Sequence, residues 1–527
     1  MAFASAFRQL VPFAGTARAF RRTEELAVLA GIVGYCVLLA LVVLWGNGSL
    51  MAAGGFIVLS AVVLLTLYRL DIGFMMLFGS ALLFGQFEVP GFTTFTYTVS
   101  YFRNLKEITY LPYFDMGDAS PFELHLIFLI AVWVVLLCVR RDYRTRPIAL
   151  WGTVCLWLVW LLGAFAYGMS SGGDFLPALW ETRALMYLGI LYAFVPQVIR
   201  TKAQITALLW VAIGGITVKA FEGILRYQGN GWSMIGYEAM QAHEDPLLIT
   251  TLFFFLAGLV VFGGHRGQRR ALLALAFPLL LGFYVGNRRA AYAAFFLSFL
   301  TYLVVIPGRN LRRALVYLIP VVILLAGYVL VFWDSDGRFA GPINQIKSGM
   351  DKDPSQGEEI VKDRNYYSNL YRKIEDYDLA VTIQNAPAVG IGFGTKYEQP
   401  LDLIPLNFAL RDYMAHNNVL WLLAKGGALG FFLFWFMLNS VGYVGASLLA
   451  RLNDPYLKSV CALSIVAIIT LVTAAFFDLH FVRYRTTIYF GTMLGLIGSI
   501  RNLTRDDPAL VQDPAVAGRA LAVEGTP

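Results

Sequence analysis

A series of long apolar stretches constrains this chain more than any other feature of its sequence. The hydrocarbon core of a bilayer calls for about 20 apolar residues per helix, and stretches of that kind recur from residue 25 to residue 500. Hydrophobic residues make up 58% of the chain and charged residues only 14%, whereas a soluble domain is about one quarter charged. The pattern predicts an all-α integral membrane protein that crosses the bilayer many times, and it excludes a soluble globular fold.

We expect about fourteen membrane-spanning helices, with both termini in the cytoplasm. The expected helices cover residues 25–45, 49–69, 72–88, 121–139, 148–167, 184–199, 204–223, 246–263, 270–285, 289–306, 312–333, 418–449, 458–476 and 484–500. They divide the chain into a basic N-terminus (1–24), eleven transmembrane helices (25–333), one large periplasmic loop (334–416), three further transmembrane helices (417–501) and a tail (502–527). The tail is rich in Pro, Ala and Asp, so we expect it to be disordered.

Basic residues in the short loops set the expected orientation. Arg and Lys concentrate in the cytoplasmic loops of membrane proteins, and three short loops are strongly basic: RRDYRTRP (140–147), HRGQRR (265–270) and PGRNLRR (307–313). All three face the cytoplasm if the N-terminus is inside, so the net charge of +7 needs no nucleic-acid partner. The longer loops then face outward, namely 89–120, 168–183, 224–245 and 334–416. We therefore expect the chemistry on the extracytoplasmic side.

The largest outer loop is expected to carry an amphipathic helix. Apolar residues recur at i, i+4, i+7 and i+11 (Leu370, Ile374, Tyr377 and Val381), and the other face is polar (Arg372, Lys373, Glu375, Asp376 and Asp378). Pro387 ends this helix, and the glycines of GIGFG (390–394) follow. The segment does not join a strand to a helix as a nucleotide loop would, so we interpret it as a structural turn.

Four arginines are expected at outer helix ends: Arg183, Arg226, Arg288 and Arg289. Any one of them could extend to the membrane interface without a function. As a group they oppose the usual bias of positive charge toward the cytoplasm. The planar guanidinium group fits phosphate oxygens bidentately, so the group predicts an anionic ligand that bears phosphate.

His416, Asn417 and Asn418 stand directly before the apolar run that starts at Val419. Histidine suits proton transfer near neutral pH, because its unperturbed pKa is about 6.5. The alternatives without a catalytic role are that His416 is an interfacial hydrogen-bonding residue and that the asparagines cap the helix. Asn417 and Asn418 could also hydrogen-bond a sugar.

Two acidic segments offer only weak signals for a metal ion. DSD (334–336) has a spacing that binds metal-nucleotides in soluble glycosyltransferases, but three residues at a helix end are a weak signal, and a solvated helix end explains them better. DKDPSQGEEIVK (351–362) begins like a calcium loop, yet its glycine falls one place late and Lys362 occupies the last ligand position. We expect neither a metal ion nor another cofactor.

The C-terminal half of the chain resembles a known superfamily. APAVGIGFG, followed by AHNNVLWLLAKGGALGFF, resembles the pattern P-x-x-G-x-G-x-G, H-N/S-x-x-L, G-x-x-G of the O-antigen ligases and repeat-unit polymerases. NRRAA resembles the S-R-x-A element of the same superfamily, with Asn287 in the serine position, and RKIEDYDLA is similar to its Arg-rich helix. These matches lie between Gly286 and Phe432.

The resemblance implies a glycosyltransferase of the GT-C type in the bacterial inner membrane. Such enzymes take a glycan from an undecaprenyl-diphosphate carrier on the periplasmic face and need neither metal nor nucleotide. The histidine that corresponds to His416 is thought to activate the acceptor hydroxyl. Arginines that correspond to Arg288, with Arg183 as a second candidate, are thought to hold the diphosphate.

From these residues we predict an inverting transfer, with His416 and Arg288 as catalytic residues. Arg183, Arg226 and Arg289 join Arg288 in the predicted diphosphate site. The predicted acceptor site comprises Asn417, Asn418, Arg372 and Tyr377.

A repeat-unit polymerase is favoured, because a donor and an acceptor that are both lipid diphosphates would use more than one arginine cluster. The alternative is a ligase that transfers O-antigen to lipid A-core. A flippase for lipid-linked oligosaccharides, the alternative of another class, should carry charges deep within its helices, and Lys219 and Glu222 come nearest to that. A non-catalytic assembly protein would leave the outer His and Arg residues replaceable.

Overall fold

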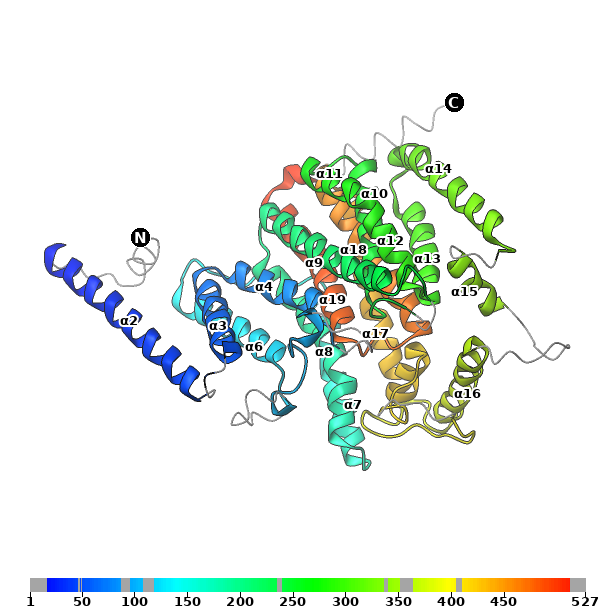
Figure 1. The fold of residues 1–527 in the computed structure, drawn as a ribbon, viewed down its shortest axis with the longest axis horizontal. Helices are drawn as coiled ribbons and strands as arrows, with labels where there is room; N and C mark the ends of the chain where they lie inside the picture. The colour runs from blue at the N-terminus through cyan, green and yellow to red at the C-terminus, as the bar shows by residue number, and fades with distance from the viewer. Residues whose placement is uncertain are drawn as a thin grey trace. The chain divides into compact units, whose positions relative to one another are not determined.

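The computed structural model describes residues 17–45, 48, 50–86, 95–107, 118–234, 239–335, 340–350, 364–403 and 410–511. The chain forms two compact units, one of residues 1–77 with 100–144 and one of residues 78–99 with 145–527. Within the described ranges, every regular element is a helix (Figure 1). The predicted all-α class is therefore confirmed for these residues. The tail after residue 511 and the acidic segment 351–362 lie outside them, as does Asp336 of the DSD segment.

The first unit contains α2 (Ala17–Trp45), α3 (Leu50–Tyr68), the start of α4 (Leu70–Leu83), η1 (Leu105–Glu107) and α6 (Pro121–Val139). Helices α2 and α3 pack together, with the rings of Tyr35 and Phe56 stacked at 5.5 Å. The side chains of Val28–Trp45 are almost all solvent-accessible although the segment is strongly apolar. Such a surface is suited to lipid rather than to water.

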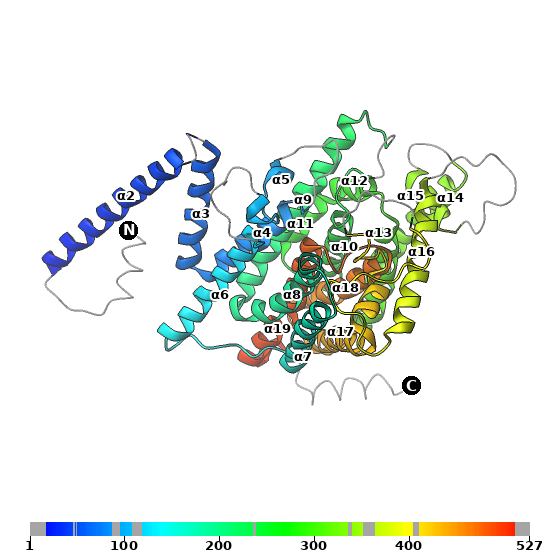
Figure 2. The same ribbon diagram turned by 90° about the horizontal axis from the view of Figure 1, so that it is seen from below.

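The second unit contains the other helices and is the larger one. They are α5 (Phe95–Thr98), α7 (Trp151–Ser170), α8 (Phe175–Val198), α9 (Lys202–Gly229), α10 (Asp245–Val261), α11 (Arg266–Ala274), α12 (Ala276–Gly286), α13 (Arg289–Val305), α14 (Gly308–Phe332), α15 (Gly341–Met350), α16 (Arg364–Asn385), α17 (Asn418–Arg451), α18 (Pro455–Phe477), α19 (Tyr484–Asp506) and η3 (Pro508–Leu510). Its core lies around α18, which packs against α10, α13, α17 and α19 (Figure 2).

Close packing of α19 on α8 depends on glycine. A Cβ atom at Gly491 would lie 2.8 Å from the carbonyl oxygen of Leu188, and one at Gly495 would lie 2.6 Å from the side chain of Val195. Both glycines therefore let the two helix backbones approach, as small residues do between membrane helices. This contact fixes the start of α19, which belongs to the site described below.

Each of the fourteen expected spans contains a helix, but the bilayer crossings are only partly established. Among the described residues, seven helices are long and apolar enough to cross a membrane, or eight if α11 and α12, bent by 55°, form one span. These helices support a multi-pass membrane protein. The count of fourteen and the inside-outside orientation stay predictions.

The structure corrects two of the expected spans and adds one helix. Helix α8 begins at Phe175 rather than at residue 184, so the expected outer loop 168–183 is reduced to residues 171–174 between α7 and α8. The charged residues Glu181 and Arg183 made this first part of the helix look like a loop. The expected span 270–285 is interrupted at Leu275, between α11 and α12. Helix α15 lies in the large loop and was not expected.

Loops that were predicted to share a side lie together in the second unit. Segments on the expected cytoplasmic side are joined by side-chain contacts, namely Asn502–Pro147, Lys202–Asp454 and Arg313–Val261. The loops before α10, α13, α17 and α19 gather at the opposite ends of the helices, and the candidate site is built there.

Candidate functional site

His416 is held by a buried glutamate of the loop helix. Its Nδ1 lies 3.0 Å from Oε2 and 3.2 Å from Oε1 of Glu375, and its backbone N–H donates to Oε2 at 2.9 Å. Only 1% of the Glu375 side chain is exposed, compared with 23% for His416. The ring of Tyr371 packs edge-on against the imidazole, with centroids 5.5 Å apart. Glu375, Tyr371 and the backbone thus fix the orientation of the ring.

The contacts with Glu375 favour one tautomer of His416. An ionised carboxylate only accepts hydrogen bonds, so Nδ1 carries a proton and donates it to Glu375. The lone pair of the neutral ring then lies on Nε2. His416 can therefore accept a proton at Nε2 while Glu375 stabilises the positive charge that results.

The two asparagines after His416 have different roles. Asn417 is the N-cap of α17 and accepts a hydrogen bond from the backbone N–H of Leu420 at 3.2 Å, so the capping alternative is confirmed for this residue. Asn418 is fully buried. Its Nδ2 donates to the carbonyl of Ala415 (2.9 Å) and its Oδ1 accepts from the backbone N–H of Phe481 (2.8 Å). Because both ends of its amide hold backbone, we leave Asn418 out of the acceptor site.

The loop helix α16 packs with a face of mixed apolar and polar residues, and not with the apolar face that its periodicity suggested. Its buried residues are Tyr371, Glu375, Asp378, Leu379 and Thr382. Tyr377 is 53% exposed and lies about 200° round the helix from Glu375, so it does not lie beside His416. Arg372 is partly buried near Asp376. Burial raises the pKa of Asp376, and a hydrogen bond with Asn417 opposes that rise.

The GIGFG segment forms a tight turn, as predicted, and packs against α17. Gly390, Gly392 and Gly394 have φ values of 70°, 81° and 82°, which side chains rarely adopt. Helix α17 is broken at Gly427. There the backbone N–H groups of Ile391 and Gly392 donate to the carbonyls of Ala424 (3.0 Å) and Lys425 (2.9 Å).

A buried ion pair fixes the same turn against α8. Lys425 Nζ lies 2.8 Å from Glu181 Oε1, and neither side chain is exposed. Glu181 also accepts a hydrogen bond from the backbone N–H of Gly394 at 2.5 Å. The turn and the ion pair together hold Glu375 of α16 in register with His416.

Arg288 lies where α12 ends and α13 begins. Asn287 before it has a φ of 42°, in the left-handed region that asparagine tolerates better than most residues; this explains an asparagine where the superfamily pattern has serine. Arg288 Nη2 donates to His243 Nε2 at 2.9 Å. Nδ1 of His243 in turn contacts the carboxylate of Asp478.

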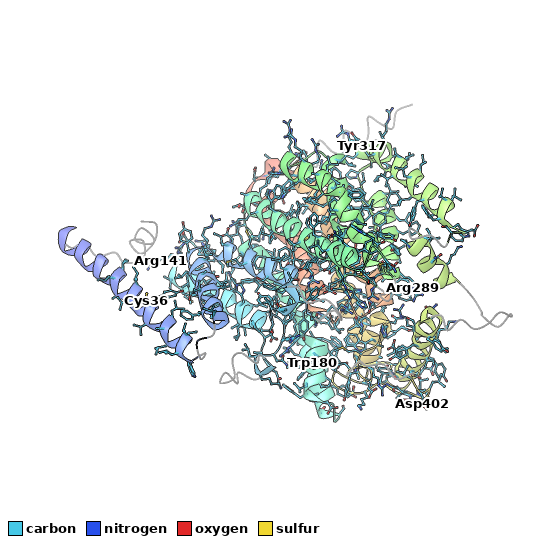
Figure 3. All side chains as sticks on the ribbon, in the orientation of Figure 1. Cys36, Arg141, Trp180, Arg289, Tyr317 and Asp402 are labelled. Carbon is cyan, nitrogen blue, oxygen red and sulfur yellow. The ribbon has the colours of Figure 1, made fainter. Side chains whose placement is uncertain are left out.

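Arg289 connects this corner to the loop helix. Its Nη1 donates to Asn369 Oδ1 of α16 at 2.7 Å. Figure 3 labels Arg289, the first residue of α13. Asn369 and Glu375 are six residues apart, a rise of about 9 Å along one helix. A series of contacts also links α17 to Arg288. Asn418 accepts a hydrogen bond from the backbone of Phe481, which lies three residues after Asp478. Asp478 contacts His243, and His243 accepts a hydrogen bond from Arg288. The structure therefore places Arg288, Arg289 and His416 around one end of the second unit.

The two other predicted arginines, Arg183 and Arg226, lie in α8 and α9 rather than in the loops that carry Arg288 and His416. Arg226 lies in the last turn of α9, as expected, and is buried. The adjacent Tyr227 packs against Tyr284 of α12, with ring centroids 6.2 Å apart. Arg183 lies within α8 rather than at its start and is also buried. Their role in binding diphosphate stays a prediction.

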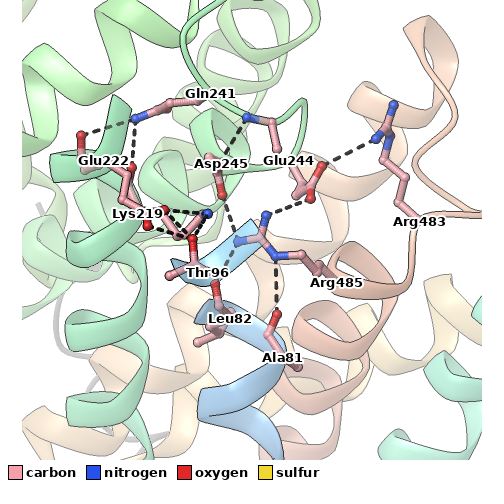
Figure 4. A network of polar contacts seen from close by, with 12 residues as sticks. Ala81, Leu82, Thr96, Lys219, Glu222, Gln241, Glu244, Asp245, Arg483 and Arg485 are labelled. Carbon is pink, nitrogen blue, oxygen red and sulfur yellow. Dashed lines mark hydrogen bonds and ion pairs between the residues drawn. The ribbon is translucent and has the colours of Figure 1, made fainter. Parts of the chain in front are cut away.

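Figure 4 shows a buried ionic network of which the sequence reasoning singled out only Lys219 and Glu222. Arg485, which has no exposed surface, donates to Glu244 at 2.7 Å and to Asp245 at 2.8 Å. Lys219 donates to Glu222 at 2.6 Å and to Thr96 at 3.0 Å. The charged sequences HED (243–245) and RYR (483–485), each next to a helix start, were the available signals.

Lys219 and Glu222, the two charges that came nearest to the pattern expected of a flippase, belong to this network. Lys219 is 1% exposed and Arg485 is completely buried. Both pair with carboxylates within hydrogen-bond distance, as buried charges must. The network joins α9, α10 and α19 to Ala81, Leu82 and Thr96, so it holds these helices together.

A comparison with protein families matches the region that holds the site. A family model described as O-Antigen ligase matches residues 271–435, which include Arg288, Arg289, Glu375 and His416. No curated protein matches the chain. The match, together with the apolar helices, supports a glycan-transfer function at a membrane, and it supports placing the chain in the predicted O-antigen ligase and polymerase superfamily.

Proposed function

We propose that the chain is a membrane glycosyltransferase that moves a glycan from undecaprenyl diphosphate to an acceptor hydroxyl on the periplasmic side of the inner membrane. The observation that carries this proposal is the contact between His416 and Glu375. A histidine whose Nδ1 is bound to a buried carboxylate keeps Nε2 as a base. This arrangement suits the deprotonation of a weak nucleophile such as a sugar hydroxyl.

In the proposed reaction, His416 Nε2 takes the proton of the acceptor hydroxyl as the oxygen attacks the anomeric carbon. General base catalysis of this kind contributes about 10²–10⁴-fold. Glu375 stabilises the imidazolium as it forms. Asn417 and Arg372, which lie next to the His416–Glu375 pair, are the candidates for contacts with the acceptor.

The leaving group is a lipid diphosphate, on which negative charge grows as the glycosidic bond breaks. Arg288 and Arg289 are proposed to stabilise this charge, a role that a metal ion has in other enzymes. Guanidinium groups suit it because they bind phosphate oxygens bidentately. Attack opposite the leaving group inverts the configuration at the anomeric carbon.

We favour a repeat-unit polymerase over a ligase, because two lipid diphosphate substrates would make use of Arg183 and Arg226 as well as Arg288 and Arg289. In the test, the purified protein is incubated with the lipid-linked repeat unit alone. A ladder of lengthening lipid-linked products supports the polymerase. Transfer only after lipid A-core is added decides for the ligase.

Replacement of His416 tests the transferase proposal itself. His416→Ala should lower the rate of transfer by at least about 100-fold at an unchanged protein level, whereas Lys373→Ala, an exposed residue of α16, should not. Full transfer by His416→Ala would contradict the role of His416 as the base. A flippase would instead move the lipid-linked glycan across vesicles without forming new glycosidic bonds.

A further inference from the structure

His243 connects two residues that lie far apart in the sequence. It is in the loop before α10, and its two ring nitrogens contact Arg288, at the start of α13, and Asp478, directly after α18. The distance from His243 Nε2 to Arg288 Nη2 is 2.9 Å. A guanidinium group only donates hydrogen bonds, so Nε2 must be the acceptor. The proton of the neutral ring is then on Nδ1 and is donated to Asp478.

The surroundings of His243 keep its ring neutral. Desolvation, and then the positive charge of Arg288, lowers the pKa of His243 to about 3, although 33% of its side-chain surface is exposed. Burial would raise the pKa of Asp478, but His243 and Arg483 hold it well below its usual value. Asp478 is thus an ionised acceptor for the Nδ1 proton.

We infer that His243 is a positioning residue for Arg288 that orients its guanidinium group toward the lipid diphosphate. This inference rests on the proposed function, in which Arg288 binds the donor. A neutral imidazole accepts a hydrogen bond from Arg288 without adding a negative charge beside the diphosphate. A carboxylate in the same place would compete with the phosphate oxygens for the guanidinium, since both bind it as charged acceptors.

The carboxylate of Asp478 is itself held by the backbone. Its Oδ1 accepts a hydrogen bond from the backbone N–H of Leu479 at 2.8 Å. Two residues later, the backbone N–H of Phe481 is held by Asn418, which follows His416 and Asn417 at the start of α17. The segment 478–481 therefore aligns the arginine of the donor site with the base of the acceptor site.

The experiment measures the binding of farnesyl diphosphate to the purified full-length protein, together with kcat and the donor KM for transfer. Three changes at His243 separate the possible roles. His243→Ala should weaken binding of the diphosphate by about tenfold or more, because one hydrogen bond to a charged group is lost, and added imidazole should restore part of it. His243→Gln, which offers a neutral acceptor, should bind more tightly than His243→Ala.

His243→Glu gives the sharpest test. It offers an acceptor to Arg288 but brings a negative charge, so it should bind diphosphate no better than His243→Ala. Binding by His243→Glu at the level of the unchanged protein would overturn the inference, as would His243→Ala with unchanged binding. A purely structural role would give equal losses for all three variants, with no rescue by imidazole, and would also overturn it.

Arg288→Ala separates this inference from the proposed function. If Arg288→Ala binds farnesyl diphosphate normally, the assignment of the donor site fails. If Arg288→Ala loses binding while His243→Ala keeps it, the donor site stands and only the role of His243 is wrong.

Discussion

Replacing Glu375 with glutamine tests the proposed base directly, because the change keeps the size of the side chain and removes its charge. Oε2 of Glu375 lies within 3.0 Å of both the backbone nitrogen and Nδ1 of His416. A glutamine oxygen in this place can accept the same two N–H groups. The position of the ring should therefore persist, and only the stabilisation of the imidazolium should be lost.

The size of the effect follows from the burial of Glu375, which is 1% exposed. Hydrogen bonds to charged groups contribute about 1.5–3 kcal/mol and are roughly twice as strong as neutral ones. Because glutamine keeps a neutral hydrogen bond, about half of this, roughly 0.75–1.5 kcal/mol, is lost when the charge on His416 develops in the transition state, and kcat should fall by about 4- to 13-fold. The donor KM should change little, since the lipid diphosphate is expected at Arg288 and Arg289.

The assay measures initial rates of transfer with the purified protein and a lipid-linked repeat unit, over a range of donor concentrations. Glu398→Gln is the matched control, because Glu398 is an exposed carboxylate that contacts Asn385 rather than His416. A Glu375→Gln variant with kcat within about twofold of the unchanged protein would refute the reasoning. So would a variant whose defect lies only in the donor KM.

Three further predictions concern topology and stability. In a background without the native cysteines, Lys373→Cys should react with a membrane-impermeant maleimide in intact spheroplasts, and Arg270→Cys should react only after permeabilisation. Gly392→Ala should destabilise the protein by more than about 1 kcal/mol, measured by thermal unfolding in detergent, because its φ is 81° and the new Cβ would meet the backbone of α7 at 2.6 Å. Lys425→Met should cost about 3–5 kcal/mol of stability in the same assay, because it leaves Glu181 buried without its 2.8 Å partner, and adding Glu181→Gln should restore part of the loss.

Each of these three predictions has a matching control. Equal labelling of the two cysteine variants in intact spheroplasts would contradict the orientation, and with it the periplasmic site. Gly229→Ala, which meets no atom within 4 Å, should leave the unfolding temperature unchanged. If Lys425→Met and the double variant unfold at the temperature of the unchanged protein, the buried pair does not stabilise the fold.

The sequence by itself determined where most of the helices lie and indicated two residues of the candidate site, His416 and Arg288. A long apolar stretch is a local property of the chain, so each of the fourteen expected segments contains a helix. His416 and Arg288 were found in the same way, because short motifs and the polar ends of apolar runs can be read without knowing their neighbours. Pro387 and the three glycines of the GIGFG turn were equally legible, since they restrict the backbone directly.

Only the tertiary structure decided how those residues are paired. Glu375 looked like one of several charges on a polar helix face, because its partner His416 lies 41 positions further along the chain. The partners His243 and Asp478 are 235 positions apart, and Arg485 is 241 positions from Glu244. A hydropathy scale gives each charged residue the same unfavourable value, whether or not a partner compensates the charge in the fold. It therefore placed the start of α8 too late and missed most of the buried network, since a charge enters the interior only when a distant partner compensates it.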